Sequence, residues 1–215
     1  MDALEAMRTI GATRFFRDED VADEVVYRAA EAARFAPQGG NRQPVRLVVV
    51  RDRAKKERLA ELYMPWWRAY FEAAEAGARE LGGSSRSKAL ANANTFAENL
   101  ANHPLIIVVC ARLDALHITD RDFDRPAVVG GASIYPYVQN LCIALRVEGV
   151  ATTITSLLVG SEPEVKDLLE IPDEYLTAAH VVAGYPLNGF PAKLTRLPVE
   201  ETVFVDTFGN PIPTP

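Results

Sequence analysis

The stretch Ala36-Pro37-Gln38-Gly39-Gly40-Asn41-Arg42-Gln43-Pro44 separates two kinds of sequence. Before it lies a segment with helical apolar spacing. After it comes Val45-Arg46-Leu47-Val48-Val49-Val50, which is rich in β-branched residues. Two prolines and two glycines so close together end a helix and lead the backbone through a tight turn into a strand. Paired glycines also let a backbone approach a ligand closely.

Two uncharged polar side chains, Asn41 and Gln43, alternate along this loop. Amide groups both donate and accept hydrogen bonds, which suits the edge of a flat heterocycle better than a metal ion or a phosphate. The same amides also suit a plain connector, in which they cap the helix and stabilise the turn. The residues alone leave both interpretations open.

The composition is that of an ordinary globular chain, with 215 residues, 48% hydrophobic and 24% charged. A formal charge of −6 argues against nucleic acid as a partner. Cys110 and Cys142 lie in apolar runs and are predicted to be buried thiols rather than a disulfide. The acidic start Met1–Glu5 does not resemble a signal peptide, and no apolar run is long enough for a bilayer. A cytoplasmic protein without membrane contact is therefore expected.

Upstream of the loop, the sequence predicts two helices. The first covers Ala3–Thr9. The second is expected to be capped by Asp18 and Asp20 and to end near Phe35, because acidic residues favour helix starts. The apolar positions of this second helix are Val21, Val25, Ala29, Ala32, Ala33 and Ala36.

Downstream of the strand near 46–50, residues 53–62 form a charged amphipathic pattern that predicts a helix. An aromatic cluster at 64–71 contains both tryptophans. Residues 82–87 read Gly-Gly-Ser-Ser-Arg-Ser, which predicts a mobile loop. A helix near 88–101 and an apolar strand at 105–110 follow.

The second half of the chain alternates helix and strand patterns. After an irregular charged loop at 112–126, helical spacing joins Ile134, Val138, Leu141 and Leu145. The remaining predicted elements are a hydroxyl-rich strand at 150–156, a helix opened by a capping box at Ser161–Glu164 and running to Leu169, and a strand at 176–183.

The tail from about 187 to 215 is rich in proline and holds one strand candidate at 202–205. An extended apolar segment of this kind has little of its own domain left to pack against. Wrapping onto a second copy would bury it, so the sequence predicts a homodimer with exchanged tails. The whole chain, 1–215, is otherwise expected to be a single domain.

Common catalytic motifs are absent from the sequence. It has no nucleophile elbow, no phosphate-binding loop with lysine and no dinucleotide glycine motif after a first strand. His103, His117 and His180 stand apart without metal-ligand spacing, so no metal site is expected. Loops rich in amides, hydroxyls and glycine, together with arginines at both ends, fit a protein that holds a large organic cofactor.

The chain resembles the flavin-dependent nitroreductases over most of its length. This resemblance implies an α+β fold with a central, mostly antiparallel sheet flanked by helices. It also implies an intertwined homodimer with FMN at the subunit interface, and chemistry centred on the flavin without a catalytic side chain. The matching pieces are residues 7–16, 36–44, 134–146, 149–152, 184–186 and 196–201.

Site residues follow from the resemblance position by position. Arg14 matches a basic residue that faces the pyrimidine side of the flavin, and the loop at 37–41 lies beside the ring. Backbone amides at 155–157 meet N5 and the carbonyl edge, while Arg196 matches a phosphate-binding arginine that can donate two parallel bonds. The cofactor-binding residues so implied are Arg14, Pro37, Gln38, Gly39, Asn41, Thr155, Ser156, Leu157 and Arg196.

The chain departs from the family pattern just before Arg14. Ile10, Gly11 and Ala12 stand where basic residues and a Ser are usual, and Gln38 stands at a common Ser position. Losing one charge-assisted phosphate contact costs about 2 kcal/mol, or roughly thirtyfold in affinity. Arg8 or Lys193 are candidates to compensate for this loss.

The implied activity is that of an FMN-dependent oxidoreductase. Electrons pass from NAD(P)H through the flavin to a small organic acceptor such as a nitroaromatic or a quinone. Trp66, Trp67 and Tyr70 are candidates for a lid over the acceptor. The alternatives are a deazaflavin-dependent or biosynthetic dehydrogenase on the same fold, and a non-catalytic protein that sequesters flavin.

Overall fold

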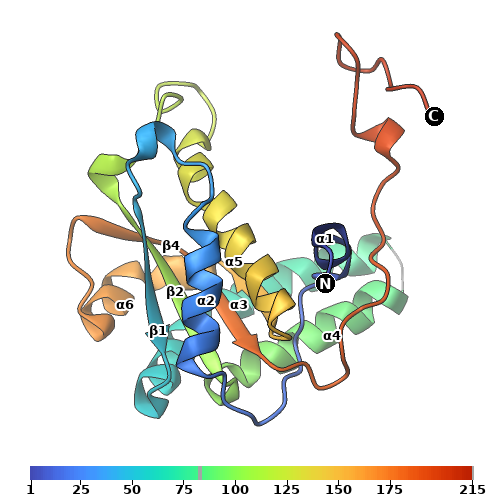
Figure 1. The fold of residues 1–215 in the computed structure, drawn as a ribbon. Coiled ribbons are helices and arrows are strands. Elements are labelled where there is room, and N and C mark those ends of the chain that lie inside the picture. Colours follow the sequence, from blue (N-terminus) through green and yellow to red (C-terminus); the bar gives the residue numbers. More distant parts are fainter. Residues whose placement is uncertain (82–83, 215) are drawn as a thin grey trace.

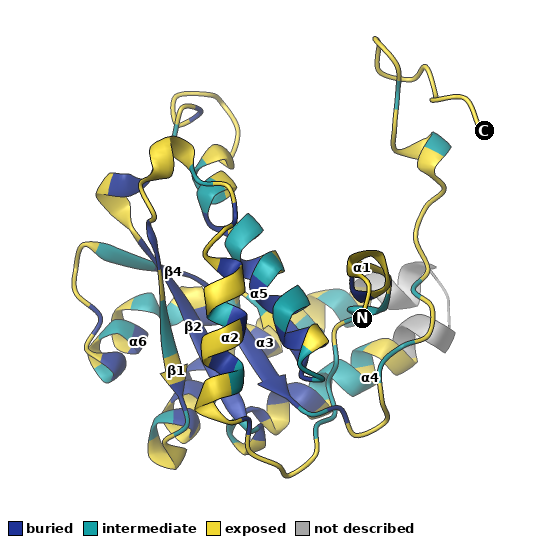
Figure 2. Ribbon diagram, viewed as in Figure 1, coloured by how far each residue is buried: buried dark blue, intermediate teal, exposed yellow. Residues whose placement is uncertain are grey.

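The computed structural model describes residues 1–81 and 84–214; for residues 77–81 and 84–87 it gives the helical backbone alone (Figure 1). Its centre is one antiparallel sheet in the order β1-β2-β4-β3. The strands are β1 (Val45–Val50), β2 (Leu105–Arg112), β3 (Ala151–Thr155) and β4 (Tyr175–Gly184). The two central strands are almost entirely buried, which explains why they read as continuous apolar runs (Figure 2).

Helices cover both faces of this sheet, which confirms the predicted α+β fold. Helices α2 and α5 pack on one face together with the apolar side chains of Leu105, Ile107 and Val109. The other face packs against α3, α4 and α6 through Ile106 and Val108. The helices are α1 (Ala3–Thr9), α2 (Asp23–Ala33), α3 (Arg53–Leu81), α4 (Ser84–Glu98), α5 (Tyr135–Val147) and α6 (Glu162–Leu169). None of the described helices is both long enough and apolar enough to cross a bilayer.

The start of α2 differs from the prediction. Its N-cap is Ala22, whose side chain makes no capping hydrogen bond, so the expected caps Asp18 and Asp20 are wrong. Negative charge in the first turn comes instead from Asp23 and Glu24, next to the positive end of the helix dipole. The predicted apolar positions Val21, Ala29, Ala33 and Ala36 are buried and Val25 is half-buried against the core; only Ala32 is exposed, and Val26 is buried as well.

The predicted helix at 53–62 and the aromatic cluster after it are parts of one long helix, α3. The helix continues through Pro65. A proline in a helix interior lacks the donor for one backbone bond, but it does not have to end a helix that is packed against other elements. Residues 84–87, predicted as loop, lie in α4, and residues 82–83 lie outside the described residues.

The capping box predicted at Ser161–Glu164 is wrong, although α6 begins there as expected. The Ser161 hydroxyl donates to the carbonyl oxygen of Leu62, 3.2 Å away, instead of capping α6. The Glu162 carboxylate accepts bonds from the backbone N–H and the hydroxyl of Thr177, at 2.7 and 2.9 Å. Both side chains therefore tie α6 to its neighbours rather than to its own first turn.

The tail divides into two parts. Its first part packs on its own chain, since the Leu187 N–H donates to Phe15 and Leu194 lies against Gly11. Its last part extends away from the body of the protein, and most of it is exposed (Figures 1 and 2). The strand predicted at 202–205 is wrong: only an isolated bridge joins Phe204 to Pro211 in the described tail.

Candidate functional site

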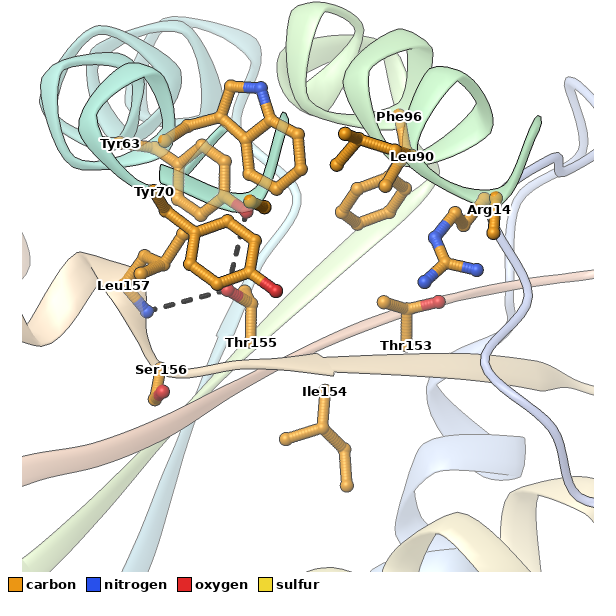
Figure 3. Close-up of a pocket in the computed structure, with 14 residues that line it drawn as sticks. Arg14, Tyr63, Tyr70, Leu90, Phe96, Thr153, Ile154, Thr155, Ser156 and Leu157 are labelled. Carbon is orange, nitrogen blue, oxygen red and sulfur yellow. Dashed lines mark hydrogen bonds between the residues drawn. The ribbon is translucent and has the colours of Figure 1, made fainter. Parts of the chain in front are cut away.

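A cavity of about 590 Å³ lies between helices α3 and α4 and the edge strand β3 (Figure 3). Helix α3 contributes Tyr63, Trp67 and Tyr70, and α4 contributes Leu90 and Phe96. These side chains make the helical wall of the cavity largely aromatic and apolar. Such a wall excludes water and suits a flat organic molecule.

Strand β3 supplies the opposite wall of this cavity. Because side chains alternate along a strand, Thr153 and Thr155 point into the cavity while Ile154 points away (Figure 3). The Thr155 hydroxyl donates to the hydroxyl oxygen of Tyr63 and accepts from the backbone N–H of Leu157, both at 3.4 Å. Burial raises the pKa of Tyr63, and its bond to Thr155 opposes this only in part. Tyr63 therefore stays neutral at physiological pH and orients the Thr155 hydroxyl.

Arg14 stands at one end of this cavity. The backbone beside it is fixed to β3, because the Thr13 N–H donates to the Thr152 carbonyl at 2.9 Å and the Thr153 hydroxyl donates to the Thr13 carbonyl. Arg14 also lines a second cavity of about 540 Å³, together with Arg196. The two cavities therefore meet at the Arg14 side chain.

Arg196 and Leu194 in turn line both this second cavity and a third one, of about 310 Å³. The third cavity is also lined by Arg8 and Lys193. Among the described residues, no Asp or Glu lines any of the three cavities. The three cavities are thus neighbours that share lining residues: the first has aromatic walls, and the third is lined by three cations, Arg8, Lys193 and Arg196.

The predicted site residues fall into two groups. Thr155, Ser156, Leu157 and Arg14 line the first cavity, and Arg196 lines the second and third. The other group, Pro37, Gln38, Gly39 and Asn41, lines none of the three.

The loop of the second group lies at the opposite end of α5 from the segment before Arg14 (Figure 1). The Gly39 N–H donates to the hydroxyl of Ser133, 3.0 Å away and just before α5. At the other end of α5, the Arg146 Nε donates to the Thr9 hydroxyl. Helix α5 has 13 residues, and at 1.5 Å per residue it is about 20 Å long. Within one protomer, the two groups therefore do not form one site.

The loop itself has an unusual backbone. Gly40, Asn41 and Gln43 have φ values of 57°, 52° and 50°, in the left-handed region. Glycine and asparagine tolerate this region best, which is why the loop needs its Gly and Asn. The side-chain oxygen of Gln38 is buried and has no hydrogen-bond partner among the described residues. Gly39, Gly40 and Asn41 are exposed, so their polar backbone groups and the Asn41 amide face solvent within one protomer.

The aromatic candidates divide as well. Trp67 and Tyr70 line the first cavity, and the Trp67 indole is held by a 2.8 Å bond to Asn94. Trp66 does not line it: its indole donates to the Ser161 hydroxyl at 2.9 Å and covers Gly160. Successive residues on a helix point about 100° apart, so the two tryptophans had to face different surroundings.

Sequence reasoning missed Tyr63, Phe96 and Thr153 as cavity residues. Thr153 could have been found from its period-two spacing with Thr155. Tyr63 and Phe96 gave no local signal, because each belongs to a helix that also carries core residues. His103 has a structural role. The centroids of its ring and the Phe96 ring are 4.6 Å apart, and its Nε2 lies 3.1 Å from the Phe96 carbonyl oxygen.

Comparison with known proteins places this geometry in a family. The model of the family described as "Nitroreductase family" matches residues 8–185, which include Arg14, the glycine-rich loop and the end of β3. The chain belongs to the nitroreductase family. The resemblance seen in the sequence is thereby confirmed, and so is the nitroreductase-like fold.

Two curated relatives and one solved structure illustrate the range of this family. The chain is 24% identical over 221 residues to the FMN reductase [NAD(P)H] of Bacillus subtilis, covering 97% of this chain and 75% of the relative. It is 28% identical over 207 residues to 5,6-dimethylbenzimidazole synthase of Rhodospirillum rubrum, covering 92% and 87%. A structure of iodotyrosine deiodinase bound to FMN and 3-iodo-L-tyrosine aligns with a TM-score of 0.73 at 21% identity, covering 96% of this chain and 100% of that chain. The family and the curated relatives indicate an oxidoreductase, whereas the structural likeness shows the fold alone.

Proposed function

We propose that this protein is an FMN-dependent oxidoreductase that passes electrons from NAD(P)H to a small organic acceptor. The observation that carries the proposal is the series of three cavities joined at Arg14, Leu194 and Arg196. FMN has a flat aromatic ring with one polar edge at one end and a phosphate at the other. The aromatic cavity suits the ring and the cationic end suits the phosphate, so the residues present fit this cofactor.

The protein residues would hold and tune the cofactor. Arg14, at the end of the aromatic cavity, would lie at the pyrimidine edge and stabilise negative charge there, because no carboxylate among the described lining residues neutralises it. The backbone at 155–157 would meet the ring edge, and Arg196 would bind phosphate. Bound FMN supplies the redox chemistry, accepting hydride from a nicotinamide and passing electrons to the acceptor. The apolar walls of α3 and α4 would cover part of the ring.

We also propose that two copies of the chain build each site, with the loop at 37–41 supplied by the partner. Two observations support this proposal. The loop lies about the length of α5 away from the segment before Arg14 in its own protomer. The end of the tail extends away from its own chain while exposing Leu197, Val199 and Phe208. A second copy would bury these side chains, as the predicted homodimer with exchanged tails requires.

The acceptor is proposed to be a nitroaromatic or a quinone, with Trp67 and Tyr70 beside it. Small side chains at Ala74, Ala89 and Ala93 keep the space between α3 and α4 open for such a molecule. Trp66 is not part of this proposal, because its indole lies outside the cavity. The cytoplasmic location expected from the sequence stays a prediction.

An absorbance experiment tests the proposed function. Purified protein incubated with FMN and freed of unbound cofactor is expected to retain the visible flavin bands. Adding NADPH or NADH without oxygen is expected to bleach these bands, and adding a quinone is expected to restore them. Loss of the flavin bands reports reduction of the bound ring, since free FMN has been removed.

Three results would contradict the proposal, each in a different way. Protein that retains no FMN would exclude FMN as the cofactor and leave the deazaflavin alternative. Protein that retains FMN but is not bleached by either nicotinamide would support sequestration of the flavin instead of catalysis. Bleaching that no quinone or nitroaromatic reverses would reject the proposed acceptors alone.

A further inference from the structure

The segment at residues 10–12 lacks side chains that could bind a phosphate. At Gly11 the structure gives a reason: an added Cβ would lie 3.0 Å from Leu194 Cδ2 and 3.1 Å from Pro191 Cγ. A side chain here would require Leu194 and Pro191 to shift by a few tenths of an ångström, because such separations are below ordinary van der Waals contact. The absence of a side chain at Gly11 thus goes together with a close approach of the tail.

The close tail brings two further cations to the end of the cavity series. Lys193 and Arg196 from the tail line the third cavity with Arg8 from the last turn of α1. Arg196 donates to the carbonyl of Thr195, and within the described part of the chain no carboxylate lines this cavity. Three cations without an acidic partner are unexpected in a chain with a net charge of −6.

A buried arginine, Arg146, holds α1 and the tail together beside this cavity. Arg146, at the end of α5, is 8% exposed and donates through Nε to the hydroxyl of Thr9, 3.2 Å away. Its guanidinium carbon lies 3.5 Å from the centroid of the Phe190 ring. Thr9 follows Arg8, and Phe190 precedes Lys193 by three residues. Arg146 therefore joins α1 and the tail, so the side chains of Arg8 and Lys193 project from elements that are held together.

We propose that Arg8 and Lys193, together with Arg196, form the binding site for the phosphate monoester of the flavin in this protein. The proposal rests on the proposed function and adds two residues to it. A phosphate monoester carries close to two negative charges at neutral pH, and each guanidinium or ammonium adds a charge-assisted bond. Leu194 and Arg196 line both the second and the third cavity, so a phosphate bound by Arg196 would lie at the border between them. The phosphate would thus be held by side chains of α1 and the tail.

Comparing FMN with riboflavin tests the phosphate site directly, because riboflavin has the same ring and no phosphate. Each flavin is titrated into protein freed of cofactor, and binding is followed by the quenching of flavin fluorescence. In the Arg8→Ala and Lys193→Ala variants, FMN affinity is expected to fall roughly tenfold or more each. Riboflavin affinity is expected to change by less than about twofold, so the preference for FMN shrinks. Arg8→Lys, which keeps the charge, is expected to recover part of the loss.

Arg17→Ala is the matched control, because Arg17 is an exposed arginine of the same N-terminal segment that lines none of the three cavities. It is expected to leave both affinities unchanged. An unchanged preference for FMN in Arg8→Ala and Lys193→Ala would overturn the inference while leaving the proposed function intact. If the two variants instead lost affinity for NADPH but not for NADH or FMN, these cations would belong to the reductant site, and the inference would be overturned as well. Wild-type protein that binds neither flavin would instead reject the proposed function.

Discussion

A chain that ends at Arg196 is expected to be a monomer, with roughly half the mass of the proposed full-length dimer, and to lose its FMN. The deletion removes Leu197, Val199 and Phe208, which are 67%, 59% and 95% exposed within one protomer. Burying these side chains on a second copy would supply much of the apolar surface of the dimer. Without the dimer, the loop at 37–41 of the partner is absent from the site. The shortened chain keeps the cavity residues Arg14 and Arg196.

Light scattering measures the mass, and flavin fluorescence measures FMN binding in the same samples. A chain that ends at Ile212 keeps the apolar side chains of the tail and serves as the control; it is expected to behave as the full-length protein. A shortened chain that stays a dimer would show that the tail does not hold the two copies together. A shortened chain that becomes a monomer but binds FMN fully would reject a site shared between copies.

The second large effect is expected at His180, in the middle of β4. This side chain is fully buried, and neither ring nitrogen has a hydrogen-bond partner among the described residues. Burial lowers the pKa of His180 from 6.5 to about 4, and the nearby Thr155 backbone opposes this only weakly. In the register of the sheet, His180 lies opposite Val108 and Thr155, so it belongs to the layer beneath the first cavity.

The sign of the pH effect follows from these two pKa values. Between pH 6.5 and pH 4, the unfolded chain binds a proton at His180 that the folded chain does not bind. The free energy of unfolding is therefore expected to fall as the pH is lowered from 6.5 to 4. Above pH 6.5, His180 is neutral in both states and no longer makes the stability depend on pH. A pKa difference of this size corresponds to about 3 kcal/mol.

Denaturant unfolding at a series of pH values measures this contribution. His180→Leu is expected to remove the part of the pH dependence of the free energy of unfolding that His180 causes between pH 6.5 and 4. At pH 7 it is expected to lower the free energy of unfolding only slightly, because it removes two unpaired polar atoms. His117→Gln removes an exposed imidazole and controls for the loss of a histidine elsewhere. If wild type and His180→Leu lost stability in parallel over this range, the account of His180 would be wrong.

Most of the fold could be predicted from local patterns. The glycine-rich loop, the strand after it and helix α5 all stand out, because Gly, Pro and apolar spacing act over a few residues. The full length of α3 could not be predicted, because Pro65 is a local break signal that tertiary packing overrides. The capping box at Ser161–Glu164 was predicted wrongly for a related reason: the Ser161 hydroxyl donates to the carbonyl of Leu62, which is distant in sequence.

The site was predicted less completely than the fold. Arg14 and the 155–157 segment are brought together by the pairing of residue 13 with β3, a contact between distant parts of the chain that no local pattern encodes. The approach of Lys193 to Arg8 depends on the path of the tail over Gly11. Gly39 and its neighbours lie at the opposite end of α5 from the segment before Arg14, so within one protomer the two predicted groups stay apart.

We propose that each flavin site combines the cavities of one copy with the loop of another, and a heterodimer tests this proposal. One chain carries Arg196→Glu, which places a negative charge at the cationic end of its own cavities. The other carries Gly39→Trp, which places a bulky ring on its exposed loop. The two chains carry different affinity tags, so that the heterodimer can be purified and its bound FMN counted. Each variant alone is expected to bind no FMN as a homodimer.

The heterodimer is expected to bind about one FMN, because one of its two sites combines the intact cavities of one chain with the intact loop of the other. That site is also expected to be bleached by NADPH. A heterodimer that binds no FMN, although both chains fold and associate, would place the loop and the cavities of each site in the same chain and contradict the account.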